Sequence, residues 1–232
     1  SEVVKQPVLV DNKAGATGAI GLAHVAKSAP DGYTLILATA SSLGTNPAVS
    51  KVPFDPVKDF APIGLLAAEP MGLAVHPSVP ANSVQELVAL AKSKPGALNM
   101  ASFGNGSVSH LAGELFGAMA GIRFTHVPYK GAAPATADLI AGQVQFMFNS
   151  ISVFVGPAKS GKLRLLATAG AERSPTLPDL PTVAESGVPG FDAGTWHALL
   201  GPAGLPPEVV ATLARDVAKW KKIVADTGIK VD

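Results

Sequence analysis

Strand-like and helix-like segments alternate along most of this 232-residue chain, and this alternation constrains the fold more than any other feature. Residues 33–39 are mostly apolar and β-branched, as in a buried strand, and residues 144–148 alternate apolar and polar side chains. Between such segments, Ser83 and Glu86 form a capping box for one helix, and Ser107 begins another. Alternating strands and helices are typical of right-handed βαβ units, so we expect an α/β protein with parallel sheets.

The same patterns predict the remaining elements. We expect further strands at residues 7–11, 63–68, 72–76, 99–102, 124–127, 163–168 and 195–200, and helices ending near residue 27 and covering 132–141, 153–160 and 207–222. Polar turns follow four strands, at residues 41–46, 102–107, 128–131 and 149–150. Ligands of parallel sheets bind beyond the carboxyl ends of the strands, so we expect these turns to converge on one site.

The turn at residues 102–107 is the strongest candidate for a binding element. Gly104 and Gly106 carry no Cβ, which allows a tight turn and a close approach of a ligand. Ser107 is a good helix N-cap, and a helix N-terminus favours a negative charge by about 0.3–1 kcal/mol when exposed. The turn therefore indicates an anion site, with an ordinary capped helix as the alternative.

Composition excludes several kinds of function. The net charge is +1 with Lys and Arg scattered along the chain, so a nucleic-acid footprint is absent. The chain has no cysteine, which removes disulfides, iron–sulfur clusters and thiol catalysis. No apolar run approaches the roughly 20 residues of a membrane span. Residues 1–7 lack the features of a signal peptide, so we expect any signal peptide to be absent from this chain.

Neither a cofactor nor a metal ion is expected. Gly15, Gly18 and Gly21 invite comparison with a dinucleotide-binding loop, but their spacing is not G-x-G-x-x-G and no acidic residue ends the next strand. Four histidines show no metal-ligand spacing, and we expect each to be structural or exposed: His24, His76, His126 and His197.

The candidate turns are rich in hydrogen-bond donors and poor in catalytic groups. Ser107 and His110 lie on one helical face, where a base rarely reaches the hydroxyl with a third group to orient it. Lys130 is the only cation in these turns, and no close pair of carboxylates is present for acid–base chemistry. Such a site binds better than it reacts, so we do not expect an enzyme. Trp196 and Tyr129 can wall a pocket or pack in the core, and both interpretations stay open.

Seven segments, in order along nearly the whole chain, resemble one known family. They are residues 31–35, 102–115, 127–132, 138–144, 161–167, 180–187 and 196–204, which include Ser-Phe-Gly-Asn-Gly-Ser-Val-Ser-His, Val-Pro-Tyr-Lys-Gly-Ala and Trp-His-Ala-Leu-Leu-Gly-Pro-Ala-Gly. Together they resemble the Bug-type extracytoplasmic solute receptors of tripartite tricarboxylate transporters.

This resemblance implies the type II periplasmic binding protein fold, with two Rossmann-like α/β lobes, a hinge and a ligand cleft between the lobes. Lobe 1 would comprise residues 1–71 and 194–232, and lobe 2 residues 72–193, with the hinge near residues 68–73 and 190–195. The implied location is the periplasm, the implied ligand is a small organic carboxylate, and the implied partners are integral-membrane transporter subunits. We expect no nucleic-acid partner and a monomer.

The ligand residues implied by the resemblance lie in the candidate turns, at the start of the helix that follows one of them, and in one strand. They are Ser41, Ser42, Asn46, Ser102, Gly104, Asn105, Gly106, Ser107, His110, Tyr129, Lys130, Gly131, Asn149 and Trp196. Asn149 offers only neutral hydrogen bonds, whereas an acidic residue there could pair with a ligand ammonium. This favours a plain di- or tricarboxylate over an amino acid.

The chain departs from the family pattern in two places. The family's first strand and its glycine-rich loop precede the point at which this chain starts, so we expect one wall of the pocket to be missing. The helical region around residues 216–222 is shorter than in family members. Two other functions stay open: a sensor protein that presents its ligand for signalling, and a hydrolase that uses Ser107 and His110.

Overall fold

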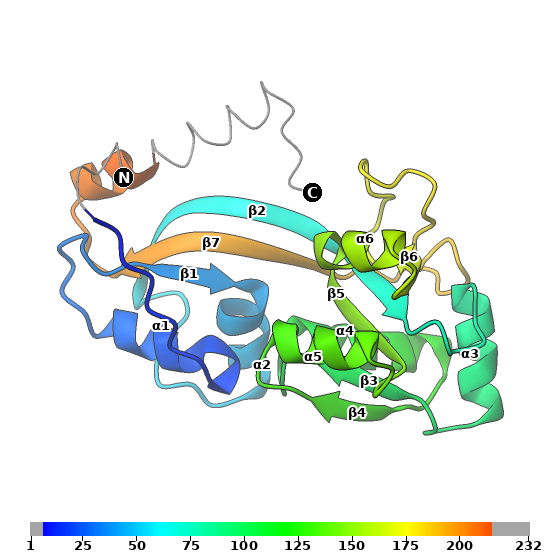
Figure 1. The fold of residues 1–232 in the computed structure, drawn as a ribbon. Coiled ribbons are helices and arrows are strands. Elements are labelled where there is room, and N and C mark those ends of the chain that lie inside the picture. The colour runs from blue at the N-terminus through cyan, green and yellow to red at the C-terminus, as the bar shows by residue number, and fades with distance from the viewer. Residues whose placement is uncertain (1–6, 215–232) are drawn as a thin grey trace. The chain divides into compact units, whose positions relative to one another are not determined.

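A computed structural model of the chain describes residues 7–214 (Figure 1). The chain divides into two compact units, unit 1 formed by Ser1–Ala68 with Trp196–Asp232 and unit 2 formed by Glu69–Thr195. The chain leaves unit 1 within strand β2 (Phe60–Val75) and returns to it within strand β7 (Gly194–Pro202). Helices and strands alternate through both units, which confirms the predicted α/β class.

Strand β3 (Asn99–Ser102) is the central parallel strand of unit 2. It pairs in parallel with β4 (Thr125–Pro128), where Ser102 lies opposite Pro128, and with β5 (Phe146–Ser150). Strand β2 is antiparallel to β5 and to β6 (Arg164–Thr168). The helices are α3 (Val84–Ser93), α4 (Val108–Ala120), α5 (Ala132–Ile140) and α6 (Ile151–Lys159). Among the strands in residues 7–214, the expectation of parallel pairing therefore holds for β3, β4 and β5 and not for β1, β2, β6 or β7.

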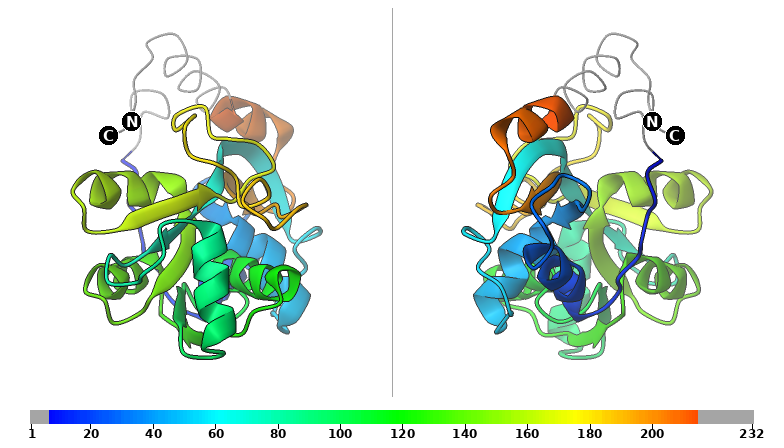
Figure 2. Two further views of the ribbon diagram at one scale, coloured as in Figure 1. Left: turned by 90° about the vertical axis from the view of Figure 1, so that its right-hand side faces the viewer. Right: turned by 90° about the vertical axis from the view of Figure 1, so that its left-hand side faces the viewer.

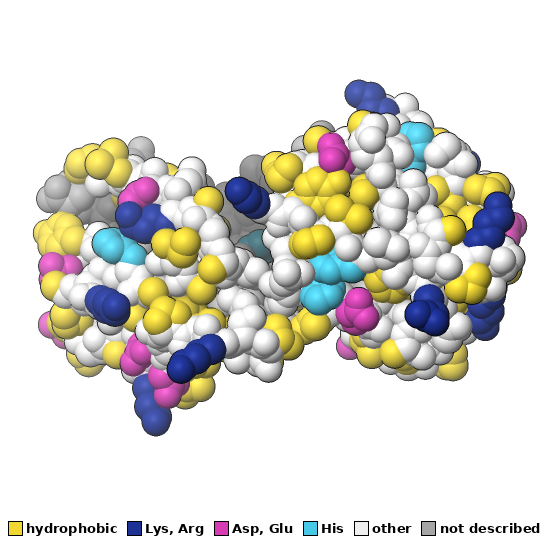
Figure 3. Space-filling model, turned by 90° about the horizontal axis from the view of Figure 1, so that it is seen from below, with side chains coloured by type: hydrophobic (Ala, Val, Ile, Leu, Met, Phe, Trp, Pro, Cys, Tyr) yellow, Lys and Arg dark blue, Asp and Glu magenta, His cyan; other side chains and the backbone are white. Residues whose placement is uncertain are grey.

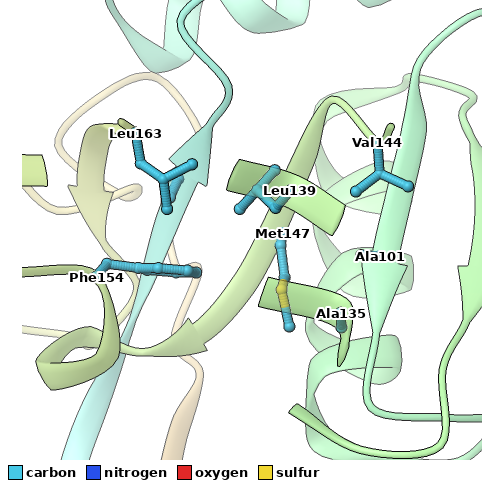
Figure 4. Packing of buried hydrophobic residues seen from close by; sticks show 8 residues of the cluster. Ala101, Ala135, Leu139, Val144, Met147, Phe154 and Leu163 are labelled. Carbon is cyan, nitrogen blue, oxygen red and sulfur yellow. The ribbon is translucent and has the colours of Figure 1, made fainter. Parts of the chain in front are cut away.

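Helices lie on both sides of the unit 2 strands (Figure 2). On one side, Phe148 of β5 packs against Phe116 of α4 with their ring centroids 5.6 Å apart. On the other side, Met147 of β5 belongs to a buried cluster with Leu139 of α5 and Phe154 of α6 (Figure 4). Successive strand residues point to opposite faces, so β5 contributes to two hydrophobic layers.

The ends of the unit 2 helices follow from local sequence. The Ser83 side chain accepts a hydrogen bond from the Glu86 N–H at the start of α3, and the Ser107 side chain accepts one from the His110 N–H at the start of α4. Helix α4 ends at Gly121, whose φ of 63° is the left-handed conformation that favours glycine. The predicted N-caps of both helices are confirmed.

Unit 1 is built on the antiparallel pair of β1 (Ile36–Thr39) and β7. Helix α1 (Ala19–Ala26), preceded by the short turn η1 (Ala16–Gly18), packs on this pair through Leu22, Ala38 and Leu200. After β1 the chain forms the helical turn η2 (Ala40–Thr45) and then α2 (Asn46–Val49), and residues 207–214 are helical.

Three of the predicted strands do not exist as separate strands in the structure. Residues 7–11 form no strand, and the side chains of Val8, Leu9 and Val10 are 67%, 91% and 84% exposed, because an apolar run becomes a strand only when it pairs with a partner. The strands predicted at 63–68 and 72–76 are one strand, β2, since the intervening residues stay extended. The predicted helix at 207–222 lies partly outside the described residues.

Within residues 7–214, no helix is long and apolar enough to cross a membrane. The same part of the chain contains no group of three His, Asp or Glu side chains that could hold a metal ion.

Substitutions at two neighbouring residues of α4, one buried and one exposed, test how the core of unit 2 is packed. Phe116 is 0% exposed and contacts Phe148 and Phe191, whereas Leu115 is 40% exposed. Phe116→Ala should lower the free energy of unfolding by about 3–5 kcal/mol, because it leaves a cavity between aromatic rings. Leu115→Ala, the matched control, should cost under about 1 kcal/mol. Urea unfolding followed by circular dichroism measures both, and equal costs would contradict this packing.

Candidate ligand-binding site

The three parallel strands of unit 2 end at one edge of the sheet, and a helix begins after each of them. Ser102 ends β3, Tyr129 follows β4, and Asn149 lies near the end of β5. Helices α5 and α6 have N-cap residues Gly131 and Ser150, and neither helix has a side-chain capping hydrogen bond. Each helix N-terminus carries a partial positive charge, so the start of α4, α5 and α6 at one edge favours an anion there.

The turn between β3 and α4 is held by two histidines. Ser102 Oγ lies 2.6 Å from His126 Nε2 and accepts a hydrogen bond from the Gly104 N–H at 3.1 Å. The Gly106 N–H donates to His110 Nδ1 at 3.2 Å. Gly104 and Gly106 have φ of 127° and 74°, which a residue with a side chain rarely adopts. The turn is therefore fixed near both of its ends.

The rings of His110 and His126 stack with their centroids 3.9 Å apart and their planes at 12°. Burial, and to a smaller extent the neighbouring His110, lower the pKa of His126 to about 4. His126 is therefore neutral at pH 7. His110 Nε2 lies 3.6 Å from Glu114 Oε1. Figure 3 shows histidine side chains at the surface beside an acidic side chain, while Lys and Arg are scattered over the face in view.

Polar contacts also fix the residues that follow β4 and β5. The Tyr129 hydroxyl donates to Asp138 Oδ2 at 2.7 Å, and burial and this carboxylate raise the pKa of Tyr129 to about 12. Asn149 Nδ2 donates to Thr136 Oγ1 at 3.2 Å, and Asn149 Oδ1 accepts from the Ser150 N–H at 2.8 Å. Both side chains are neutral and hold fixed orientations.

The predicted site residues of unit 2 all lie at this edge of the sheet. They are Ser102, Gly104, Asn105, Gly106, Ser107, His110, Tyr129, Lys130, Gly131 and Asn149. Ser102 and Ser107 are fully buried. Ser107 Oγ accepts from the backbone N–H of His110, and the His110 ring instead accepts from Gly106. These contacts support the turn and do not resemble a serine–histidine catalytic pair.

The predicted site residues of unit 1 are Ser41, Ser42, Asn46 and Trp196, and they lie around η2. Ser42 forms a capping box with Thr39, whose Oγ1 accepts from the Ser42 N–H at 3.1 Å. Gly44 of η2 faces the Trp196 ring, since a Cβ at Gly44 would lie 3.9 Å from it. The buried Asn46 side chain donates to the Ala16 carbonyl at 3.0 Å.

The carbonyl that Asn46 contacts belongs to the turn at residues 15–18. The sequence analysis considered this turn only as a possible dinucleotide-binding loop. Ala16 and Thr17 have φ of 47° and 53°, and such left-handed conformations cost about 1–3 kcal/mol each where they are strained. A Cβ at Gly18 would lie 2.7 Å from Ser42 Cβ, so glycine allows this turn to approach η2. The spacing of Gly15, Gly18 and Gly21 marked this turn in the sequence but did not predict its contact with η2.

His126, Ser109 and Thr136 are further residues of the unit 2 edge that the sequence analysis did not assign to the site. His126 was expected to be structural or exposed, and its contact with Ser102 depends on the β3–β4 register, in which Met100 lies opposite His126. Ser109 Oγ donates to the Phe148 carbonyl at 2.6 Å and ties α4 to β5. No spacing along the chain reveals contacts of this kind.

Comparisons with known proteins agree with this architecture. Residues 1–226 match the model of the tripartite tricarboxylate transporter family receptor. Protein BugT of Bordetella pertussis is 36% identical over 215 residues, which cover 91% of this chain and 66% of BugT. The chain thus spans just under two thirds of the length of that relative.

Two solved structures from Rhodopseudomonas palustris are similar over most of the chain. Rpa4515 with adipate has a TM-score of 0.91 and 38% identity, covering 94% of this chain and 74% of that one. MatC with bound malate has a TM-score of 0.88 and 35% identity, with the same coverage of 94% and 74%. A family match over nearly the whole chain, together with these structures, confirms the resemblance to Bug-type proteins. This chain belongs to the family of tripartite tricarboxylate transporter receptors.

Proposed function

We propose that this protein is a periplasmic receptor that binds a small organic carboxylate for a tripartite tricarboxylate transporter. The observation that carries the proposal is the edge of unit 2 where α4, α5 and α6 begin beside neutral hydrogen-bond donors. The family to which the chain belongs supports it, as do the two similar structures from Rhodopseudomonas palustris, one with adipate and one with bound malate.

The proposed unit 2 site binds a carboxylate through helix N-termini and neutral groups. Helix N-termini stabilise an anion without a charged side chain, and hydrogen bonds to an ionised group are each worth about 1.5–3 kcal/mol. Lys130 adds an exposed cation at the start of α5. The polar groups of Ser41, Ser42 and Asn46 beside Trp196 are proposed to bind ligand in unit 1. The family is one of receptors, and the Ser107 hydroxyl accepts from the backbone N–H of His110 while the His110 ring accepts from Gly106, so we propose binding without catalysis.

The environment of Asn149 supports a plain di- or tricarboxylate as the ligand. Its Oδ1 accepts from the Ser150 N–H and its Nδ2 donates to Thr136, so its orientation is fixed and it brings no charge. An α-amino group on the ligand would find a neutral amide here in place of a carboxylate. Integral-membrane transporter subunits are the proposed partners, which would receive the ligand from this receptor.

A thermal-shift measurement with adipate and malate tests the proposal. A ligand at about 1,000 times its Kd stabilises a protein by roughly 4 kcal/mol, which raises the Tm of a chain of this size by about ten degrees. We expect such a shift with at least one of the acids and none with adipamide, which has the same carbon chain without charge. The absence of a shift with every small carboxylate tested would contradict the proposal.

A charge placed at Asn149 tests the site itself. Asn149→Asp keeps the shape of the side chain, and the Thr136 hydroxyl can reverse to donate to the new carboxylate. A negative charge within about 10 Å of a bound carboxylate costs at least about 1.7 kcal/mol at an effective dielectric constant near 20. We therefore expect calorimetry to show affinity for the carboxylate reduced by at least about tenfold.

The matched control is Gln143→Glu, which makes the same change from amide to carboxylate on an exposed residue of unit 2. It should leave the affinity within about twofold, since exposed charges are largely screened by salt. Equal losses in both variants would show that net charge, and not the position of Asn149, controls binding.

A further inference from the structure

His126 is connected to the candidate site through one buried hydroxyl. Ser102 is fully buried, and its Oγ lies within hydrogen-bonding distance of His126 Nε2 at 2.6 Å, of the Gly104 N–H at 3.1 Å and of the Gly104 carbonyl at 3.2 Å. Ser102 therefore couples the His126 ring of β4 to the backbone of Gly104. Movement of the ring would therefore disturb the hydrogen bonds that Ser102 makes with Gly104.

His110 holds the other end of the same turn. Its Nδ1 accepts from the Gly106 N–H, so this nitrogen carries no proton, and its ring stacks on His126. A proton on Nδ1 would remove the lone pair that Gly106 uses. The two rings therefore hold the two ends of the turn, His126 through Ser102 and His110 through Gly106.

The groups around His126 make a charge on it unfavourable. Helix α4 contributes His110 directly and Glu114 behind it, 3.6 Å from His110 Nε2. Strand β3 contributes the uncharged Ser102. After β4, Tyr129 directs its hydroxyl to Asp138 of α5, and Lys130 is exposed. Among residues 7–214, the nearest carboxylate in these contacts, Glu114, pairs with His110 and not with His126, and His110 would repel a charge on the ring stacked against it.

We propose that His126 is a positioning residue, which acts through Ser102 to hold the 102–107 turn in its ligand-binding shape and loosens that turn when it is protonated. The proposal rests on the proposed function, because it concerns the same turn. The proposal adds a pH dependence to that function. Protonation of His126, in addition to protonation of the ligand, weakens binding of the carboxylate in acid.

The direction of this pH dependence follows from the pKa of His126 in the ordered turn and in the loosened turn. In the structure the pKa of His126 is about 4, whereas a histidine released to solvent has a pKa near 6.5. Above pH 6.5 both states are neutral and the ordered turn has no penalty. As the pH falls from 6.5 towards 4, the loosened turn takes up the proton first and gains population, by up to about tenfold for each pH unit.

Amide hydrogen exchange of the ligand-free protein measures this loosening directly. After correction for the intrinsic exchange rate, the protection of the Gly104 and Gly106 amides should fall by at least about tenfold between pH 7 and pH 5. NMR titration of the histidine rings should give a pKa for His126 well below 6.5. Unchanged protection, or an ordinary pKa for His126, would overturn the proposal.

Two substitutions separate positioning from simple structural support. His126→Gln keeps an amide near the position of Nε2 but cannot titrate, so the turn should stay protected at both pH values. His126→Ala removes the contact with Ser102, so protection should be low at both. His24→Gln on α1 of unit 1 is the control and should follow the wild type. If His126→Gln keeps the wild-type pH dependence, another group is responsible.

Adipate affinity completes the test. The ratio of wild-type to His126→Gln affinity cancels protonation of adipate itself, and it should fall between pH 7 and pH 5 as the loosened turn gains population. A ratio that rises in acid would show that protonated His126 attracts the ligand, contrary to the proposal. If no carboxylate binds the wild type at pH 7, the proposed function fails, while hydrogen exchange still decides whether His126 holds the turn.

Discussion

The parallel pairing of β3 with both of its neighbours is the constraint on which the rest of unit 2 depends. Because β3, β4 and β5 run in the same direction, their carboxyl ends meet at one edge of the sheet. Each strand is followed by a helix, so α4, α5 and α6 begin at that edge as well. The same pairing that buries Met147 and Phe148 on opposite faces therefore concentrates helix N-termini where the polar turns lie.

Much of this fold could be predicted because its signals are local. Ser83 and Ser107 cap helices through hydrogen bonds to residues three positions away, which any reading of the sequence can find. Pairing is not local. Residues 7–11 have the composition of a strand and form none, and β2 joins two predicted strands because the residues between them stay extended. The antiparallel partners of β1 and β2 likewise lie far away in sequence.

The candidate site shows the same division between local and distant signals. Glycines and an N-cap were enough to single out residues 102–107 as a candidate binding element. The contact of His126 with Ser102 spans 24 positions and depends on strand register. The left-handed conformations of Ala16 and Thr17 could not be foreseen either, because neither residue is a glycine and their turn is tied to Asn46, 30 positions away.

The burial of the predicted site residues divides them by role. Ser102 and Ser107 are fully buried, and both hydroxyls are engaged within the turn. Such groups orient the backbone more readily than they touch a ligand, whereas Asn105 and Lys130 are exposed at the same edge. A site that binds through oriented backbone N–H groups depends on the rigidity of its turn, since each donor must already point at the carboxylate. In the proposed site, the side chains that fix the turn should therefore contribute to affinity as well as those that face the ligand.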